Sequence, residues 1–387
     1  MLSHEENELL VRVGPGTPAG ELLRRYWHVV AAVAEISDEK PKKQVKILGE
    51  DLVLFRDARG RYGLVGEHCS HRGVSLYYGF VEEDGIRCPY HGWKYDGCGN
   101  CIEQPFESAS FKEKIRHPAY PVIELAGLLF TYMGPPEKRP VLPRWDVLVR
   151  EDGSQKIDIC EMLCCNWLQA MENSVDPTHT YYLHSHNLKL KGAKDYVPFH
   201  YQQVNRIDFE MVIHAQWAGI QKQRFFGGDE SRAEAPHPLI FPNILFVPVR
   251  LGYAMHFRTP IDDLSTRVFQ FRFNPTRDGK AAERPEVTPI EYIPTKNADG
   301  EFHLENFTSQ DHMAWETQGA IANRAREHLG DGDRGIIMFR KLLREQIAAV
   351  QKGDDPVGVN LDPTRDEVIQ MIQDGYSAFS HARSLGM

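Results

Sequence analysis

The chain has 387 residues, of which 42% are hydrophobic and 26% charged, and its formal net charge is −9. This length suits two or three domains and is sufficient for a large core. The acidic balance argues against nucleic acid or an anionic membrane as the main partner, because both bind basic surfaces.

The cysteine count and the N-terminal residues indicate the cellular compartment in which the protein works. The start MLSHEENELLV lacks the basic and apolar regions of a secretory signal, and the apolar runs are shorter than a membrane span. The chain has 7 cysteines, an odd number in a sequence too long to need disulfides for stability. We therefore expect a cytoplasmic protein whose clustered cysteines bind metal.

The first third of the chain predicts β-structure. Residues 27 to 133 carry short runs of alternating apolar residues, with glycine and aspartate between them. The proline-rich stretch GPPEKRPVLP follows, from Gly134 to Pro143, and is typical of a linker between domains. We place the boundary near residue 140, with one domain over residues 1–140 and a second over residues 141–387.

The remainder mixes helices and strands. Residues 164–175 predict a helix because large apolar side chains recur every four positions. Residues 200–275 alternate again and predict long antiparallel strands. Residues 309–351 predict helix, and residues 364–376 predict a short C-terminal helix. The fold class is α+β, with an all-β domain first.

Two thiols and two imidazoles lie in matched pairs within the β region. The pairs are Cys69-Ser-His71 and Cys88-Pro-Tyr-His91, with residues 72–87 between them. Such donors hold zinc or an iron–sulfur cluster. Because each pair mixes one thiol with one imidazole, the order favours a two-iron cluster with Cys69 and Cys88 on one iron and His71 and His91 on the other. A structural zinc site is the alternative.

A second metal motif follows the linker. Asp176, His179 and His184 have the spacing D-x-x-H-x-x-x-x-H. Two imidazoles and a carboxylate on one side of Fe(II) leave positions open for O₂ and substrate. The histidines are separated by about 140° round an ideal helix, so a shared metal requires a local irregularity. Alternatively, Asp176 only caps a helix whose first residue is Pro177.

These motifs resemble those of a known family. The first stretch, extended to Gly92-Trp93, is similar to the Rieske motif of oxygenases, and it lacks the flanking disulfide cysteines of respiratory Rieske proteins. The later stretch is similar to the catalytic signature of Rieske non-heme iron oxygenases in Asn166-Trp167, Glu172-Asn173, Asp176, His179 and His184. The chain is identified as a member of this aromatic ring-hydroxylating family, as an alpha subunit of its phthalate-dioxygenase-like branch.

The resemblance implies a fold and two cofactors. The fold would be an all-β Rieske domain followed by a helix-grip (START-like) catalytic domain with a central antiparallel sheet. The cofactors would be a [2Fe-2S] Rieske cluster on Cys69, His71, Cys88 and His91, and a mononuclear Fe(II) on His179, His184 and a later carboxylate.

The third iron ligand rests on the resemblance of Gln310-Asp311 and the following segment to that branch, which implies Asp311. Glu316 and Asp333 are rival ligands. Asp311 also fits a different role, because Thr308 to Asp311 is typical of a capping box at a helix start.

The resemblance also implies partners. Asp176 would bridge an iron histidine to the cluster histidine His91 of an adjacent subunit, so the assembly would be a homotrimer or stacked trimers. A flavin- or ferredoxin-type reductase would supply electrons from NAD(P)H.

The expected activity is oxygenation of an aromatic substrate, with ring hydroxylation of an aromatic carboxylate as the leading interpretation. Lys189, Lys191 and Lys194 either attract such an anion or belong to a solvated loop. An O- or N-dealkylating or aryl-ether-cleaving monooxygenase is the alternative. A Rieske electron carrier without oxygenase activity is a more remote one. The nearby thiols Cys98 and Cys101 are either a redox pair or two incidental cysteines.

Overall fold

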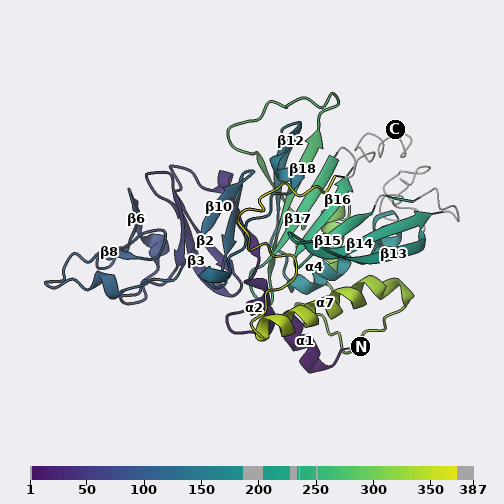
Figure 1. Ribbon diagram of the computed structural model, residues 1–387, viewed down its shortest axis with the longest axis horizontal. Helices are drawn as coiled ribbons and strands as arrows, with labels where there is room; N and C mark the ends of the chain where they lie inside the picture. The colour runs from purple at the N-terminus through teal and green to yellow at the C-terminus, as the bar shows by residue number, and fades with distance from the viewer. Residues whose placement is uncertain (1, 186–203, 227–232, 235, 250–251, 373–387) are drawn as a thin grey trace.

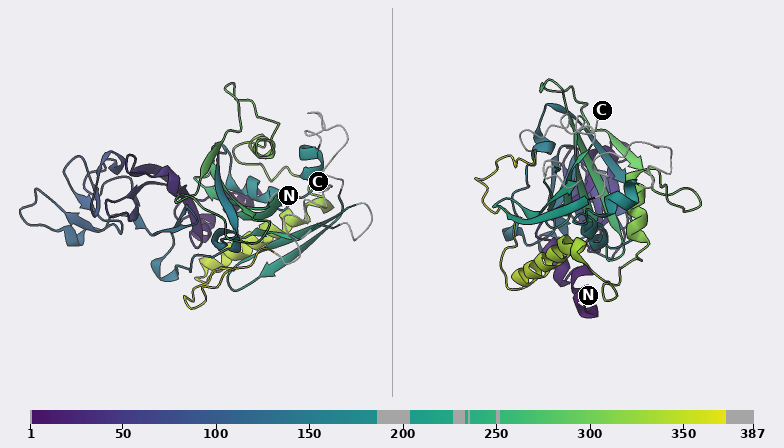
Figure 2. Two further views of the ribbon diagram at one scale, coloured as in Figure 1. Left: turned by 90° about the horizontal axis from the view of Figure 1, so that it is seen from above. Right: turned by 90° about the vertical axis from the view of Figure 1, so that its right-hand side faces the viewer.

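A computed structural model of the chain describes residues 2–185, 204–226, 233–234, 236–249 and 252–372. The molecule is elongated, with small sheets around β2, β3, β6 and β8 at one end and a large sheet with its helices at the other (Figures 1 and 2).

The small sheets are built from the predicted β region. They hold, in spatial order, β1 (Trp27–Ala32), β11 (Leu128–Tyr132) and β10 (Val122–Leu125); β2 (Lys42–Ile47), β3 (Glu50–Arg56), β4 (Tyr62–Gly66) and β9 (Ala119–Tyr120); and β5 (Phe80–Glu82), β6 (Gly85–Arg87), β7 (Lys94–Tyr95) and β8 (Cys101–Glu103). All of these pairs are antiparallel.

Within the described ranges, the large sheet has eight strands. In spatial order they are β13 (Val204–Ile213), β14 (Ala218–Phe226), β15 (His237–Ile240), β16 (Ile244–Val249), β17 (Gly252–Pro260), β18 (Thr266–Pro275), β12 (Gly153–Cys160) and β19 (Ile290–Ile293). The sheet is antiparallel apart from the pair of β12 with the edge strand β19.

The helices are short apart from the last. They are α1 (His4–Val11), α2 (Pro18–Leu23), α3 (Asp146–Val149), α4 (Trp167–Asn173), α6 (Phe307–Glu316) and α7 (Arg334–Gln351). Single turns of 3₁₀-helix are η1 (Val33–Glu35), η2 (Leu76–Tyr78), η3 (Lys112–Lys114), η4 (Pro136–Lys138) and η7 (Asp331–Asp333), and η5 (Thr180–His184) is a π-helical turn.

The central strands of the large sheet are buried on both faces. One face of β17 and β18 packs against β1 and β11, where Phe130 and Phe257 meet edge to face with ring centroids 5.6 Å apart. Residues of α4 and α7 form the other apolar cluster, together with Ile220 and Leu239 of the sheet. The sheet therefore lies between the small β-sheets and the helices, and the two ends of the molecule share one core.

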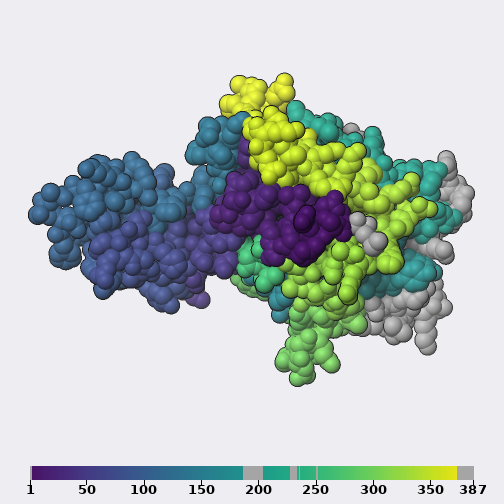
Figure 3. Space-filling view, turned by 90° about the horizontal axis from the view of Figure 1, so that it is seen from below, coloured from purple at the N-terminus to yellow at the C-terminus, as the bar shows by residue number. Residues whose placement is uncertain are grey.

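The N-terminal helices belong to the core of the large-sheet end. Leu10, Leu22 and Leu23 are fully buried in the same cluster as Phe339 and Leu343 of α7. Figure 3 shows this N-terminal segment on the surface beside the C-terminal part of the chain. The boundary near residue 140 stays a prediction, and the N-terminal helices pack across it.

The prediction of continuous helix over residues 309–351 is wrong in its middle. The first helix ends at Glu316 because the buried amide of Gln169 donates to the carbonyl oxygens of Trp315 and Gly319, at 2.8 and 2.9 Å. These bonds satisfy carbonyls at the helix end, and the chain then continues without helix to the next one, α7.

The predicted C-terminal helix is also wrong over residues 364–372, the part that the structure describes. There the chain runs as an extended strap, paired at Ile369 with Trp145. The buried carboxylate of Asp146 accepts from the backbone N–H groups of Met371 and Ile372, at 3.0 and 2.9 Å. These donors are therefore bonded to a side chain instead of to a helical turn.

Among the described residues, no helix has both the length and the apolar character needed to cross a membrane.

His28 joins the two ends of the molecule. Its ring is 1% exposed, its Nε2 is 2.8 Å from the carbonyl oxygen of Leu23, and its Nδ1 is 3.2 Å from the side-chain amide nitrogen of Asn243. The ring is therefore neutral, with Nε2–H donating and Nδ1 accepting. Burial lowers the pKa of His28 to about 4, with a further contribution from the positive charge of Arg24.

This predicts a pH-dependent stability that His28 controls. The unfolded histidine has a pKa near 6.5, so the unfolded chain takes up the proton first. The contribution to stability is present above pH 6.5 and is lost as the pH falls towards 4. Between pH 7.5 and 5.5, the free energy of unfolding should fall by about 1 kcal/mol more in the wild type than in His28→Gln. Urea titrations at both pH values measure this, and an equal loss in both proteins would contradict it.

Candidate metal centres

The two motif histidines share one side of a π-helical turn. Helix α4 stops at Asn173, the chain turns at Asp176-Pro177, and residues Thr180–His184 form η5. In a π-helix the backbone bonds join residues five apart, so His179 and His184 lie one turn apart. Their rings are 5.1 Å apart, edge to face. The irregularity that the spacing required is therefore present.

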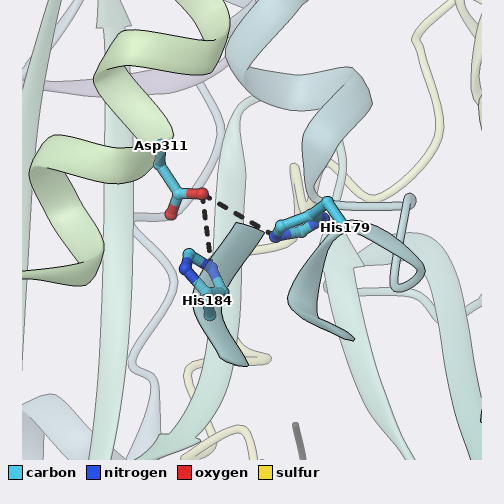
Figure 4. Close-up of side chains that lie close together, drawn as sticks. All are labelled: His179, His184 and Asp311. Atoms are coloured by element: carbon cyan, nitrogen blue, oxygen red, sulfur yellow. Dashed lines mark ion pairs between the residues drawn. The ribbon is translucent and has the colours of Figure 1, made fainter. Parts of the chain in front are cut away.

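Asp311 comes to the same place from the other side. Figure 4 shows its carboxylate pointing from α6 towards both imidazoles. Its Oδ1 is 3.4 Å from His184 Nε2 and 3.7 Å from His179 Nε2, and the three ligand atoms all lie within 4.8 Å of one another. This oxygen is buried without a hydrogen-bond partner. An unsatisfied carboxylate oxygen facing two imidazole nitrogens fits a divalent metal ion.

The capping-box alternative for Asp311 is wrong. Helix α6 begins one turn earlier, and its N-cap is Asn306, whose side chain accepts from Ser309 N–H at 2.8 Å. Asp311 therefore lies inside the helix and has no capping role.

The rival carboxylates are occupied elsewhere. Glu316 accepts from the backbone N–H of Cys164 at 3.1 Å and pairs with Lys296 at 2.5 Å. Asp333 accepts from the backbone N–H of Gly330 at 2.8 Å. Neither belongs to the group of three that could hold a metal.

Outer contacts turn both imidazoles so that Nε2 faces Asp311. His184 Nδ1 is 2.7 Å from the side-chain oxygen of Gln310, and His179 Nδ1 contacts the backbone oxygen of Asp176. Each Nδ1 therefore carries the proton and donates it, so the electron pair on each Nε2 points towards Asp311 and can bind a metal. Burial lowers the pKa of His184, so this ring is neutral and suited to bind metal.

Asp176 lies at the edge of this group and is not a member of it. Its Oδ1 accepts from the backbone N–H and the hydroxyl of Thr178, at 3.0 and 2.5 Å, and its Oδ2 is 3.7 Å from His179 Nδ1. Burial raises the pKa of Asp176, but the contacts with His179 and Thr178 outweigh this and lower it. The carboxylate is therefore ionised, and it is 25% exposed, so a second group can reach it.

Two buried basic side chains from the sheet hold the segment that leads to these histidines. The guanidinium of Arg258 on β17 donates to the carbonyl of Ala170 and the hydroxyl of Ser174, and Lys222 on β14 donates to the carbonyl of Ser174 at 2.6 Å. These groups lie at the C-terminal end of α4, where the helix dipole favours positive charge. The sequence pattern did not indicate either residue, because charged residues recur throughout these strands.

The signature residues on α4 are structural. Asn166 caps the helix by accepting from Leu168 N–H at 3.1 Å. Glu172 is buried and accepts from Arg324 at 2.8 Å and from Arg340 at 2.6 Å. They fix the helix that precedes the metal-binding turn.

The cysteine–histidine pairs lie on two loops with the same hydrogen bonds. In the first, Cys69 N–H donates to Val74 O at 3.0 Å and Gly73 N–H donates to Cys69 O at 2.8 Å. In the second, Cys88 N–H donates to Trp93 O at 2.8 Å and Gly92 N–H donates to Cys88 O at 3.1 Å. Both glycines have φ of +75°, which other residues rarely adopt.

These loops bring the four donors together. Cys69 and Cys88 are buried, and the rings of His71 and His91 have centroids 4.6 Å apart. His71 Nδ1 is buried without a partner. Burial raises the pKa of the Cys88 thiol, and the adjacent Cys69 adds to the rise, so the thiolate pair requires a cation. The donor set and the unsatisfied nitrogen fit a cluster with two sulfur and two nitrogen ligands.

Side chains around the loops shield this site. Trp93 stacks on His71 with centroids 4.5 Å apart, and the Tyr95 hydroxyl is 3.2 Å from Cys69 Sγ. Tyr95 was not indicated by the motif, although it lies two residues beyond Trp93. Cys98 is exposed and Cys101 buried, and both are free thiols.

Two segments of the chain match families of known proteins. Residues 26–121 match a family model described as Rieske [2Fe-2S] domain. Residues 295–372, which include Asp311, match one described as LigXa C-terminal domain like.

Curated relatives match over most of the chain. It is 38% identical over 387 residues to the 5,5'-dehydrodivanillate O-demethylase oxygenase subunit of Sphingobium sp. (strain NBRC 103272 / SYK-6), covering 96% of this chain and 86% of the relative. It is 38% identical over 383 residues to the phenoxybenzoate dioxygenase subunit alpha of Ectopseudomonas oleovorans, covering 91% of this chain and 87% of the relative. It is 30% identical over 399 residues to the phthalate 4,5-dioxygenase oxygenase subunit of Pseudomonas putida, covering 92% of this chain and 89% of the relative.

A solved structure agrees in fold. The reduced complex between oxygenase and ferredoxin in carbazole 1,9a-dioxygenase contains a chain that is 21% identical, with a TM-score of 0.63 and coverage of 91% of this chain and 98% of that one. The extent and identity of the curated matches decide the family: the chain belongs to the oxygenase subunits of the Rieske non-heme iron oxygenases, which carry a Rieske [2Fe-2S] cluster and a mononuclear iron.

Proposed function

We propose that this oxygenase component acts on an aromatic carboxylate, with its mononuclear iron on His179, His184 and Asp311. The convergence of three ligand atoms within 4.8 Å, with one carboxylate oxygen lacking a partner, carries the assignment of the iron site. The [2Fe-2S] cluster belongs on Cys69 and Cys88 for one iron and on His71 and His91 for the other.

The protein's own groups prepare the iron site. When bound, the iron supplies the position at which O₂ is reduced and the substrate oxidised. Gln310 and the backbone of Asp176 accept the Nδ1 protons, so both Nε2 atoms stay available as ligands. Because three protein ligands lie on one side, the opposite side of the ion is left for substrate and O₂.

Electrons would enter from a neighbouring copy of the chain. The cluster loops follow β4 and β6 in the small sheets at one end of the molecule (Figure 1), whereas η5 and α6 are bonded to the large sheet, through Arg224 to Thr180 and Gln270 to Thr308. The exposed side of the Asp176 carboxylate suits contact with the partner subunit's His91, and this bridge would link cluster and iron in a homotrimer or stacked trimers. A flavin- or ferredoxin-type reductase would supply the electrons from NAD(P)H.

The names of the relatives support the substrate class. Phenoxybenzoate and phthalate are aromatic carboxylates. The demethylase relative keeps O-demethylation as a second candidate reaction. The lysines Lys189, Lys191 and Lys194 lie outside the described residues and do not enter this proposal.

Asp311→Ala should remove the mononuclear iron and spare the cluster, because one of three protein ligands is lost. Iron should fall from about three to about two atoms per chain, while acid-labile sulfide stays at about two. Glu316→Ala is the matched control and should keep its full iron. Full iron in Asp311→Ala would move the ligand role to another residue.

Asp176→Asn should keep both metals and lose at least about a hundredfold in product formation. The amide retains the size of the side chain but removes the charge and one acceptor between the two imidazoles. Turnover with a reductase and metal analysis measure the two effects, with Asp333→Asn as a control acid. Normal turnover of the Asp176 variant would exclude the bridge.

A screen tests the substrate class. The holoprotein with a reductase and NADH should consume O₂ and give oxygenated or demethylated product with phthalate, 3-phenoxybenzoate or a methoxybenzoate, as seen by mass spectrometry. Product from neutral aromatics only would overturn the carboxylate assignment.

A further inference from the structure

The face of the large sheet beneath α6 carries polar side chains that the metal sites do not use. Strand register places four side chains in one row across β16, β17, β18 and β12, because residues directly opposite share a face. The row is Leu245, His256, Gln270 and Asp158.

Helix α6 fixes where this row lies relative to the iron site. Gln270 Nε2 donates to Thr308 Oγ1 at 3.3 Å, and the Arg258 guanidinium is 4.8 Å from the ring centroid of Trp315. Thr308 and Trp315 lie one turn before and one turn after Asp311 on the helix. His256 is the strand neighbour of Gln270 and lies two residues from Arg258, so it is beneath the turn that holds Asp311.

His256 is available for a ligand. Neither ring nitrogen makes a hydrogen bond within the part of the chain that the structure describes, and the side chain is partly exposed. Its neighbours Met255 and Phe257, on the opposite face, are 0% and 2% exposed. Burial lowers the pKa of His256 well below its usual value, so the ring is neutral and offers one N–H donor.

The groups around His256 favour an oxygen anion as the acceptor of its N–H. Arg272 donates to Gln270 Oε1 at 3.1 Å, which fixes the amide with its oxygen turned away and its nitrogen towards Thr308. That nitrogen carries two hydrogens, and Thr308 takes one. Arg272 also pairs with Asp158. Arg258 has no carboxylate within 4.0 Å among the described residues, so its charge is not neutralised by a direct partner.

We propose that His256 and Gln270 donate hydrogen bonds to the carboxylate of the aromatic substrate and thereby orient its ring towards the iron. Arg258 adds positive charge behind them. This inference rests on the proposed function and names the residues that select its substrate. The apolar ring of the substrate would lie against the Leu245 end of the row.

Binding to the iron-loaded protein without O₂ tests the proposal. Calorimetry with 3-phenoxybenzoate and phthalate is compared with 3-phenoxytoluene, in which a methyl group replaces the carboxylate. His256→Phe and Gln270→Leu should each weaken binding of the acids about tenfold or more, as for a lost hydrogen bond to a charged group. Binding of 3-phenoxytoluene should change less than about threefold.

Matched variants separate recognition from folding. His256→Asn keeps a donor and should recover most of the affinity, and His214→Phe removes an exposed imidazole at the end of β13 and should bind as the wild type does. With an acid that turns over, His256→Phe should raise KM and lower the ratio of product to O₂ consumed, with full iron and an unchanged cluster spectrum.

The outcomes are distinct. Wild-type affinity for the acids in both variants, with product still formed from those acids in the wild type, overturns the role of His256 and Gln270 and leaves the proposed function intact. Wild-type protein that neither binds nor converts any aromatic acid overturns both. If His256→Phe does not fold, the affinities of Gln270→Leu and His256→Asn for the acids decide whether His256 and Gln270 bind the carboxylate.

Discussion

The buried guanidinium of Arg258 is the interaction on which the geometry of the iron site depends. From β17 it reaches the carbonyl of Ala170 and the hydroxyl of Ser174 at the end of α4, and it lies 4.8 Å from the ring of Trp315 on α6. The first helix leads into the two histidines and the second carries Asp311. Burial lowers the pKa of Arg258 to about 10, so it stays charged at neutral pH. One cation thus ties both ligand-bearing segments to the sheet.

The metal-binding residues lie mainly where regular structure is interrupted. The π-helical turn places two histidines that are five residues apart on the same side of the helix. The two cluster loops share one hydrogen-bond pattern, and each contains a glycine with φ of +75°. An ordinary helix would separate the histidines, and a strand would place Cys88 and His91, three residues apart, on opposite faces. Each interruption is fixed at its ends, by β-strands for the loops and by α4 for the turn.

Short-range patterns were predictable from the sequence, and most contacts across the chain were not. The meeting of Asp311 with the two histidines was expected only from the resemblance to the family. The β alternation, the helix at α4 and both metal motifs depend on residues within a few turns of one another. The end of α6 depends on Gln169, and the extended strap at residues 364–372 depends on Asp146, so neither boundary has a local signal. Arg258 and His256 look like ordinary polar residues of a strand until the register and the covering helix are known.

Arg258 and His256 lie on the same face of β17 beneath α6, but they have different contacts and therefore different roles. The guanidinium of Arg258 donates to a carbonyl and a hydroxyl oxygen at the end of α4, while its Nε is buried without a hydrogen-bond partner, so Arg258 supports that helix. Among the described residues, His256 makes no hydrogen bond and Gln270 Nε2 makes one, so each side chain has a donor left. A ligand oxygen would complete them, and a ligand without one would leave them desolvated and unpaired. A site of this kind rejects analogues that lack the polar group more strongly than it distinguishes apolar rings of similar size, so selectivity rests on the polar end of the substrate.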